Sequence, residues 1–145
     1  PLSGKLTRLG IRTVVAAAPG LSQAWADPVQ LSIVLQNLVN NAADALGAEG
    51  RPSREISVLL EDHGAMVEFH VCDNAGGIAP ELVNHLFEPF KTTKTGGMGL
   101  GLAICRSLVE ANGGRIWLAR SGPEGACVAF SVPAGNAVAA EGSHE

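Results

Sequence analysis

Two lysines, three threonines and four glycines stand together in the segment KTTKTGGMGLGLAI, residues 91–104. Glycines let a backbone bend and approach a ligand closely, while lysines and hydroxyls suit an anionic ligand. The apolar residues that follow predict a helix, whose N-terminus offers unpaired N–H groups and a partial positive charge. The segment is therefore a candidate phosphate-binding loop, although a glycine cluster alone is also typical of a flexible loop before a core helix.

Two familiar phosphate motifs do not fit this chain. A Walker A loop ends in Gly-Lys-Ser/Thr, and here the pair Gly4-Lys5 is followed by Leu6. The dinucleotide fingerprint requires a third glycine where Leu102 stands, and it should directly follow a strand. If residues 91–104 bind phosphate, they do so as another kind of loop.

A second group of polar residues lies on one edge of a predicted helix. Asn37, Asn41 and Asp44 share a narrow arc at 100° per residue, beside an apolar stripe formed by Leu31, Val34, Leu35, Leu38, Ala42, Ala45 and Leu46. Short polar side chains are poor helix formers and are costly when buried without partners. A single Asn would be explained by solvation or capping. Three aligned residues favour a ligand site, and their oxygens suit a hard ion such as Mg²⁺.

Asp73 follows a predicted strand directly in the segment CDNAGGI. Its carboxylate could accept a hydrogen bond from the exocyclic amine of a purine. Asp and Asn before glycines are also typical of a simple turn, and for Asp73 alone that is the better explanation.

The rest of the pattern predicts the elements that must hold these residues. Asp27-Pro28 predicts the start of a helix, because Asp caps helices and Pro favours their first turn. Strands are expected at 12–17, 54–60, 66–72, 115–120 and 127–132, and helices at 28 to about 46, 80 to about 87, and about 100 to 112. Helices on one face of a largely antiparallel sheet make an α+β sandwich.

Composition narrows the class of protein. A chain of 145 residues with 46% hydrophobic and 17% charged residues is expected to form one globular domain. A net charge of −4 with scattered basic residues argues against a nucleic-acid partner, and the absence of a long apolar run argues against membrane contact. Cys72, Cys105 and Cys127 are predicted to be buried reduced thiols, in keeping with a cytoplasmic location. A start at Pro1 rather than Met suggests a piece of a longer protein.

Taken together, four motifs are much more specific than any one of them. NLVNNAADA (37–45), DNAGGI (73–78), LFEPF (86–90) and GMGLGL (97–102) occur in this order. They resemble the N, G1, F and G2 boxes of the ATP-binding catalytic domain of sensor histidine kinases. The form PFKTTKTGGMGLGLAI is most similar to kinases of the nitrogen-regulation and oxygen-sensing type.

The resemblance implies the Bergerat ATP-binding fold, a two-layer sandwich with a mixed, mostly antiparallel sheet packed on three helices. It covers residues 12–133 as the catalytic domain, with 1–11 as a polar lead from a preceding domain and 134–145 as a flexible tail. ATP would be held between helices under a mobile lid.

The resemblance also implies roles for individual residues. Asn41 would coordinate Mg²⁺, Asn37 would support the metal and phosphates, and Asp44 would line the pocket. Asp73 would accept the adenine amine, and Gly77 would let the base approach the backbone. Lys94 is a further expected catalytic residue, with Asn37 and Asn41. The other expected nucleotide contacts are Ile78, Phe90, Lys91, Thr92, Thr93, Gly97, Met98, Gly99, Leu100, Gly101 and Leu102.

Two positions depart from the family pattern. Ala75 stands where the G1 box usually has a glycine, which leaves close approach of the backbone in question there. Gly125-Ala126 stands where the last strand often has Gly-Thr, so one expected hydroxyl is missing.

Relatives that hydrolyse ATP, and anti-sigma serine kinases, carry a glutamate four residues before the metal-binding Asn. Here that position is Asn37, an amide that cannot accept a proton, which favours a histidine kinase. The alternatives are an ATPase or serine kinase of the same fold, and an ATP-binding module without transfer activity.

The acceptor histidine is expected elsewhere. In this family it precedes Glu or Asp on a helical hairpin, whereas His63, His70 and His85 precede other residues and His144 lies in the terminal tail. The expected partners are therefore a separate dimerisation domain of the parent protein and, downstream, a response regulator. The chain itself is expected to be monomeric.

Overall fold

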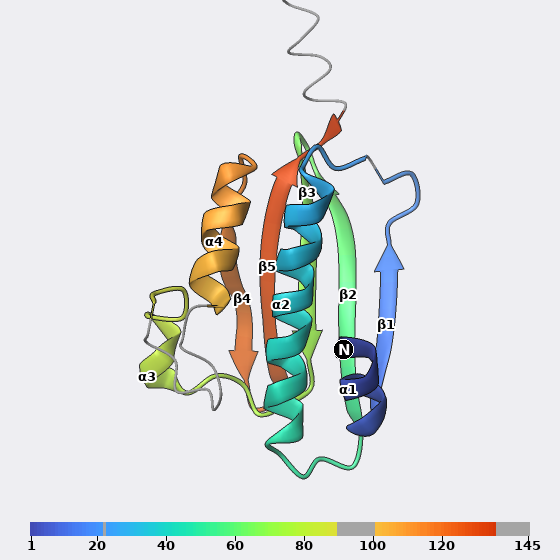
Figure 1. Cartoon of the computed structure of the whole chain (residues 1–145), viewed down its shortest axis with the longest axis vertical. Coiled ribbons are helices and arrows are strands. Elements are labelled where there is room, and N and C mark those ends of the chain that lie inside the picture. The colour runs from blue at the N-terminus through green and yellow to red at the C-terminus, as the bar shows by residue number, and fades with distance from the viewer. Residues whose placement is uncertain (22, 90–100, 136–145) are drawn as a thin grey trace, which may run out of the picture.

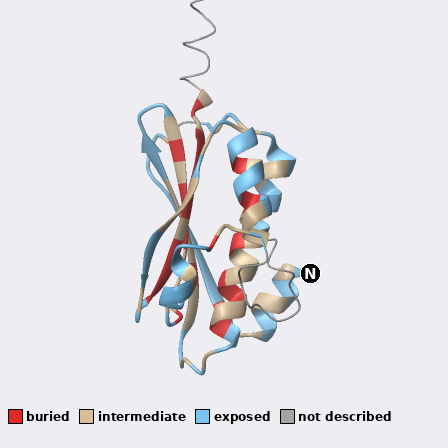
Figure 2. Cartoon of the chain, turned by 90° about the vertical axis from the view of Figure 1, so that its left-hand side faces the viewer, coloured by how far each residue is buried: buried red, intermediate tan, exposed pale blue. Residues whose placement is uncertain are grey.

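The computed structural model describes residues 1–21, 23–89 and 101–135, which form a sheet covered on one face by helices (Figures 1 and 2). The elements in chain order are α1 (Leu2–Arg8), β1 (Ile11–Ala17), α2 (Pro28–Gly47), β2 (Arg54–His63), β3 (Met66–Asp73), α3 (Pro80–Val83), α4 (Gly101–Ala111), β4 (Ile116–Gly122) and β5 (Gly125–Pro133). No helix in these ranges is both long and apolar enough to cross a membrane.

The five strands form one sheet in the order β1-β2-β3-β5-β4. β1 pairs with β2 in parallel, and the other three pairs are antiparallel. The predicted α+β sandwich with a mixed, mostly antiparallel sheet is confirmed, and the five strands lie at the predicted places.

The core lies between the sheet and α2. Phe69 of β3 and Phe130 of β5 stack with ring centroids 4.7 Å apart, and Phe130 is fully buried. The apolar side of α2 packs over the sheet with its buried residues Val34, Leu38, Ala42, Ala43 and Leu46. Because each large apolar side chain buried in this way contributes about 1.5–3 kcal/mol, this layer fixes where α2 lies on the sheet.

Both ends of α2 follow from its sequence. Asp27 caps the N-terminus by accepting hydrogen bonds from Val29 N at 2.9 Å and Gln30 N at 3.2 Å, and Pro28 occupies the first turn. The helix ends at Gly47, close to the predicted Leu46.

Polar contacts hold α4 against α2. The Cys105 thiol lies 3.9 Å from the carbonyl oxygen of Val34. At the other end of α4, Asn112 Nδ2 donates to Gln30 Oε1 at 2.8 Å, and Asn112 Oδ1 accepts from Asp27 N at 2.9 Å. These contacts fix the position of α4 along α2.

Structured residues lie at both ends of the predicted catalytic domain. Within the segment 1–11, expected as a polar lead from a preceding domain, residues 2–8 form α1, and Leu6 and Leu9 pack against the core. At the other end Ala134 is buried and forms a bridge with Ala24, while most of the predicted tail lies outside the described residues. The helix predicted from 80 to about 87 is shorter than expected, because α3 ends at Val83 and turns lead on to residue 89.

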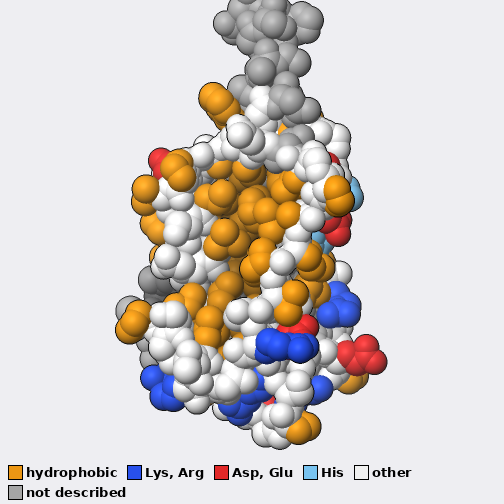
Figure 3. All heavy atoms as spheres, turned by 90° about the vertical axis from the view of Figure 1, so that its right-hand side faces the viewer, with side chains coloured by type: hydrophobic (Ala, Val, Ile, Leu, Met, Phe, Trp, Pro, Cys, Tyr) orange, Lys and Arg blue, Asp and Glu red, His pale blue; other side chains and the backbone are white. Residues whose placement is uncertain are grey.

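The sheet edge at β1 leaves apolar surface uncovered. Val15 is 72% exposed and Val14 is 38% exposed. Figure 3 shows hydrophobic side chains gathered over a large area of this side of the molecule. A contiguous exposed apolar area of this kind is typical of a surface that contacts another protein or domain.

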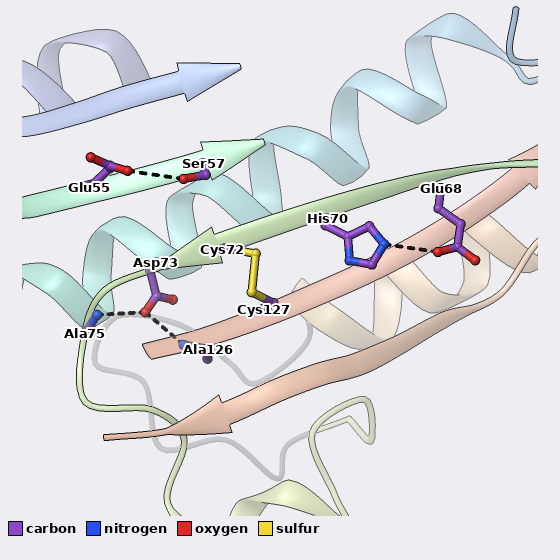
Figure 4. Close-up of a disulfide and its surroundings, with 9 residues drawn as sticks. All are labelled: Glu55, Ser57, Glu68, His70, Cys72, Asp73, Ala75, Ala126 and Cys127. Atoms are coloured by element: carbon purple, nitrogen blue, oxygen red, sulfur yellow. Dashed lines mark hydrogen bonds and ion pairs between the residues drawn. A yellow bond between two sulfur atoms is a disulfide. The ribbon is translucent and has the colours of Figure 1, made fainter. Parts of the chain in front are cut away.

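The prediction of three reduced cysteines was wrong for two of them. Cys72 of β3 and Cys127 of β5 are direct partners in the antiparallel register and form a disulfide (Figure 4). The sequence could not reveal this, because the two cysteines are 55 positions apart and local patterns do not show that β3 pairs with β5. Disulfides persist in oxidising compartments, so the cysteines no longer support a cytoplasmic location. Cys105 is the free cysteine, and burial raises the pKa of its thiol to about 11.

We expect the chain, purified without reductant and then unfolded, to expose one thiol to a colorimetric thiol reagent, and three after reduction. A disulfide closing a loop of this length typically stabilises a fold by about 2–4 kcal/mol, so reduction should also lower the free energy of unfolding by that order. Cys105→Ser is the control, because it should leave no reactive thiol before reduction. Three reactive thiols in the unreduced wild type would contradict the disulfide.

Candidate functional site

The polar edge of α2 meets the first residue of α4. A Cβ built on Gly101 would lie 3.7 Å from Asn37 Oδ1, which is ordinary van der Waals contact. The Asn37 amide is oriented by a 2.9 Å hydrogen bond from its Nδ2 to the carbonyl oxygen of Ile33. The structure thus brings together Asn37 and Gly101, which are far apart in the sequence and which the motifs assign to one site.

Asn41 and Asp44 lie further along the same edge of α2, and both are half-buried. Lys5 of α1 forms an ion pair with Asp44, and its ammonium also donates to Asn40 Oδ1 at 2.7 Å. No sequence pattern indicated this contact, because it joins residues 39 positions apart. Asp44 is therefore bound to α1 at the border of the predicted pocket.

An open groove runs between α1 and α2 on this side. It carries the basic side chains of Lys5 and Arg8 next to Asn37. The residues that line it are Pro1, Leu2, Lys5, Arg8, Ile33, Gln36, Asn37 and Asn40. Since Asp73 and Gly101 do not line it, this groove is a neighbour of the predicted nucleotide pocket and not the pocket itself.

Asp73 lies at the end of β3, where its side chain turns toward the backbone of two other segments (Figure 4). Its Oδ1 accepts hydrogen bonds from Ala75 N at 3.0 Å and Ala126 N at 3.4 Å. Burial raises the pKa of Asp73, an effect that the two backbone hydrogen bonds oppose and the nearby Glu49 reinforces. Both backbone donors use Oδ1, and among the described residues none donates to Oδ2, which could therefore accept from a ligand.

The loop after Asp73 is held by side chains from other elements. Glu49 Oε1 accepts from Gly76 N at 2.9 Å, and Ser121 Oγ accepts from Ile78 N at 2.8 Å. Neither Glu49 nor Ser121 belongs to a motif, so sequence reasoning missed both. Ile78 is thereby placed next to the β4–β5 hairpin.

Gly77 has a structural reason to be glycine. Its φ is +84°, and a Cβ on it would lie 2.5 Å from the carbonyl oxygen of Gly122. The close approach in this structure is to the backbone of β4. Its expected approach to an adenine base remains a prediction.

The two departures from the family pattern are accommodated by the backbone. Ala75 is 1% exposed and belongs to the core, so a small side chain is packed where the family usually has none. Ala126 donates its backbone N–H to Asp73, a contact that does not depend on the side chain at this position. The main chain therefore supplies both donors that hold Asp73.

The described part of the G2 box is the start of α4. The described part of this helix runs from Gly101, and Leu102 packs against the core. The remaining predicted lid residues lie outside the described residues: Phe90, Lys91, Thr92, Thr93, Lys94, Gly97, Met98, Gly99 and Leu100.

An α+β sandwich with the N-box amides beside the G2 glycine, and an aspartate at the end of a central strand, defines the class of ATP-binding domains that includes histidine kinases. Residues 26–136 match the family described as "Histidine kinase-, DNA gyrase B-, and HSP90-like ATPase", and the chain belongs to this family.

The similar proteins are sensor histidine kinases, as the motifs predicted. The chain is 40% identical over 117 residues to the sensor protein FixL of Bradyrhizobium diazoefficiens, covering 80% of this chain and 23% of FixL. It is 42% identical over 108 residues to the histidine kinase/phosphatase NtrB of Rhizobium meliloti, covering 66% of this chain and 28% of NtrB. The chain thus spans about a quarter of the length of these relatives.

Solved structures agree with the family assignment. The catalytic domain of the histidine kinase ThkA superimposes with a TM-score of 0.77 at 31% identity, covering 92% of this chain and 85% of that one. Full-length ShkA in complex with AMPPNP superimposes with a TM-score of 0.78 at 29% identity, covering 92% of this chain and 27% of ShkA.

We expect Gly77→Ala to destabilise the fold strongly, because the new Cβ would meet the Gly122 carbonyl and the backbone would still need a positive φ. Gly64→Ala is a matched control, since its φ is +64° and no atom lies within 4 Å of the added Cβ. The positive φ alone costs roughly 1–2 kcal/mol. Urea unfolding should therefore show a clearly larger loss for Gly77→Ala, and equal losses would contradict the packing of Gly77 on β4.

Proposed function

We propose that this domain binds Mg-ATP and donates the γ-phosphoryl group to a histidine on a separate dimerisation domain, as one step of two-component signalling. The observation that carries the proposal is the proximity of Asn37 and Gly101 in a chain of this family, with Asp73 at the end of β3. Membership of the family supports ATP as the ligand, and the polar residues indicate where it would bind.

In this proposal each residue has a role that suits its chemistry. Asp73 accepts the adenine amine with Oδ2, while backbone donors keep Oδ1 in place. Asn41 and Asn37 offer amide oxygens, which are suitable ligands and supports for Mg²⁺ bridged to phosphate. Mg²⁺, when bound, neutralises phosphate charge during transfer. The lid residues 90–100, with Lys94 as their catalytic member, complete the site.

Asn37 favours transfer to histidine over hydrolysis. An amide cannot take a proton from water or from a serine hydroxyl, so the site lacks the general base of the ATP-hydrolysing relatives. Transfer to an imidazole needs mainly alignment and charge neutralisation. An ATPase, a serine kinase and an ATP-binding module without transfer activity remain the competing functions.

The proposed partners lie outside this chain. ThkA has been solved in complex with the response regulator protein TrrA, and we propose an analogous regulator downstream of this domain. The uncovered apolar surface around β1 supports contact with a second domain of the parent protein (Figure 3). A cytoplasmic location belongs to the same proposal, because ATP and response regulators are found there.

We expect Asp73→Asn to weaken binding of Mg-ADP, because the amide replaces a charged acceptor with a neutral one. One charged hydrogen bond of this kind is worth roughly 1.5–3 kcal/mol, or about ten- to a hundredfold in affinity. Isothermal titration calorimetry measures the difference. Unchanged affinity would place the adenine away from Asp73, and no binding by the wild type at millimolar nucleotide would contradict ATP binding itself.

The stability of Asp73→Asn against pH is a control that shows whether the variant is folded. Because the folded-state pKa of Asp73 is raised above its ordinary value of 3.8, the stability that its protonated form contributes is present below pH 3.8 and is lost as pH rises through the raised pKa. The Asn amide can still accept both backbone hydrogen bonds but never ionises. In urea unfolding near neutral pH, the free energy of unfolding of the variant should therefore be at least as large as that of the wild type. The difference between the two should grow as pH rises from 3.8 through the raised pKa of Asp73.

We expect the chain, mixed with the separately produced dimerisation domain of its parent protein and labelled ATP, to place label on a histidine. That label is acid-labile and alkali-stable, and it should appear faster than free phosphate. Asn41→Ala should abolish the label because a metal ligand is lost. Rapid phosphate release by the chain alone, with no label on the added domain, would identify an ATPase.

A further inference from the structure

The outer face of the β2–β3 hairpin carries a group of charged and imidazole side chains. This face is the one that no helix covers (Figure 2). Val67 and Phe69 of β3 are buried in the core on the other face, so the alternate residues Glu68 and His70 point outward. Glu61 of β2 is the direct partner of Glu68 in the antiparallel register.

Three of these side chains converge on one point. His63 Nε2 lies 3.1 Å from Glu61 Oε2 and 3.5 Å from Glu68 Oε1, and the three ligand atoms all lie within 4.8 Å of one another. Ligands about 2.0–2.2 Å from a tetrahedral ion are separated by about 3.3–3.6 Å. The distances from His63 Nε2 to Glu61 Oε2 and to Glu68 Oε1 are therefore already close to the distances between ligand atoms around a bound metal ion.

The electrostatics of the hairpin also favour a cation at this point. Two glutamates directly opposite each other on one face of a sheet repel, and such pairs destabilise the strand pairing. A positive ion between Glu61 and Glu68 removes this repulsion. His63 adds a nitrogen ligand from the end of the hairpin.

Glu68 is held in position before any ion arrives. Its side chain is 16% exposed, and its Oε1 lies 3.0 Å from His70 Nε2 (Figure 4). The His70 ring in turn stands edge-on to Trp117, with centroids 6.3 Å apart. Glu61 and His63 are about half exposed, which leaves the site open to ions from solution.

We propose that Glu61, His63 and Glu68 form a binding site for a divalent transition-metal ion, with Zn²⁺ as the preferred ion and water in its fourth position. Imidazole with carboxylates selects such ions over Mg²⁺ and Ca²⁺, which prefer oxygen ligands alone. The site is separate from the nucleotide pocket, because Asp73 lies at the opposite end of β3. A bound ion joins β2 to β3 and stabilises the folded chain by linkage.

The test is a titration of the intact, disulfide-bonded chain with Zn²⁺ and with Co²⁺, without nucleotide. We expect one equivalent of Zn²⁺ to bind in calorimetry and to raise the melting temperature, and Co²⁺ to give visible absorption bands, whereas Mg²⁺ at the same concentration does neither. Loss of a supporting residue alone typically weakens a metal site by about 10- to 100-fold. His63→Ala and Glu68→Gln should therefore weaken Zn²⁺ binding at least ~10-fold.

His85→Ala is the matched control, because His85 also pairs with a glutamate, Glu88, at 2.9 Å but has no second carboxylate within ion-pair distance among the described residues. It should bind Zn²⁺ like the wild type. Urea unfolding without metal verifies that each variant is folded. The proposal is overturned if the wild type binds no Zn²⁺, or if folded His63→Ala and Glu68→Gln chains bind it with wild-type affinity.

Discussion

The packing of α2 on the sheet is the interaction on which the candidate site depends, because α2 presents both its apolar and its functional side chains from one rigid element. Leu46 and Val34 are fully buried against the sheet, and this burial sets the rotation of the helix. Asn37, Asn41 and Asp44 follow on the edge of the same surface, so the core sets the side of the helix from which they project, and contacts such as the hydrogen bond from Asn37 to Ile33 then orient the side chains. The fixed position of α4 along α2 then brings Gly101 to Asn37.

Asp73 shows how a binding residue can work against the stability of the fold that holds it. Burial raises its pKa, which means that the ionised form suited to an adenine amine is the form that the folded protein tolerates less well. Backbone donors from Ala75 and Ala126 offset part of this cost by holding Oδ1. A site that needs an ionised carboxylate in partial burial therefore requires donors that cannot move away, and main-chain N–H groups meet that need.

The sequence allowed prediction of those features that depend on neighbours along the chain. Asp27 and Pro28 marked the start of α2, and alternation marked β2 and β3, because caps and side-chain direction are local properties. Features that depend on strand register or on distant contacts were missed: Cys72 with Cys127, Lys5 with Asp44, and Glu49 with Gly76. Gly77 lay between the two cases, since its motif was evident while its contact with Gly122 depends on how β4 folds back.

β3 contributes residues to the core, to the open face of the sheet and to the candidate site, because a strand presents alternate side chains to opposite faces. Val67, Phe69 and Val71 face the helices, while Glu68, His70 and Cys72 lie on the open face of the sheet. The strand ends in Asp73, whose contact with Ala126 lies next to the disulfide in the β3–β5 register. The pairing of β3 with β5 therefore connects the open face of the sheet to the candidate nucleotide site. The disulfide restrains that pairing one residue away from Asp73.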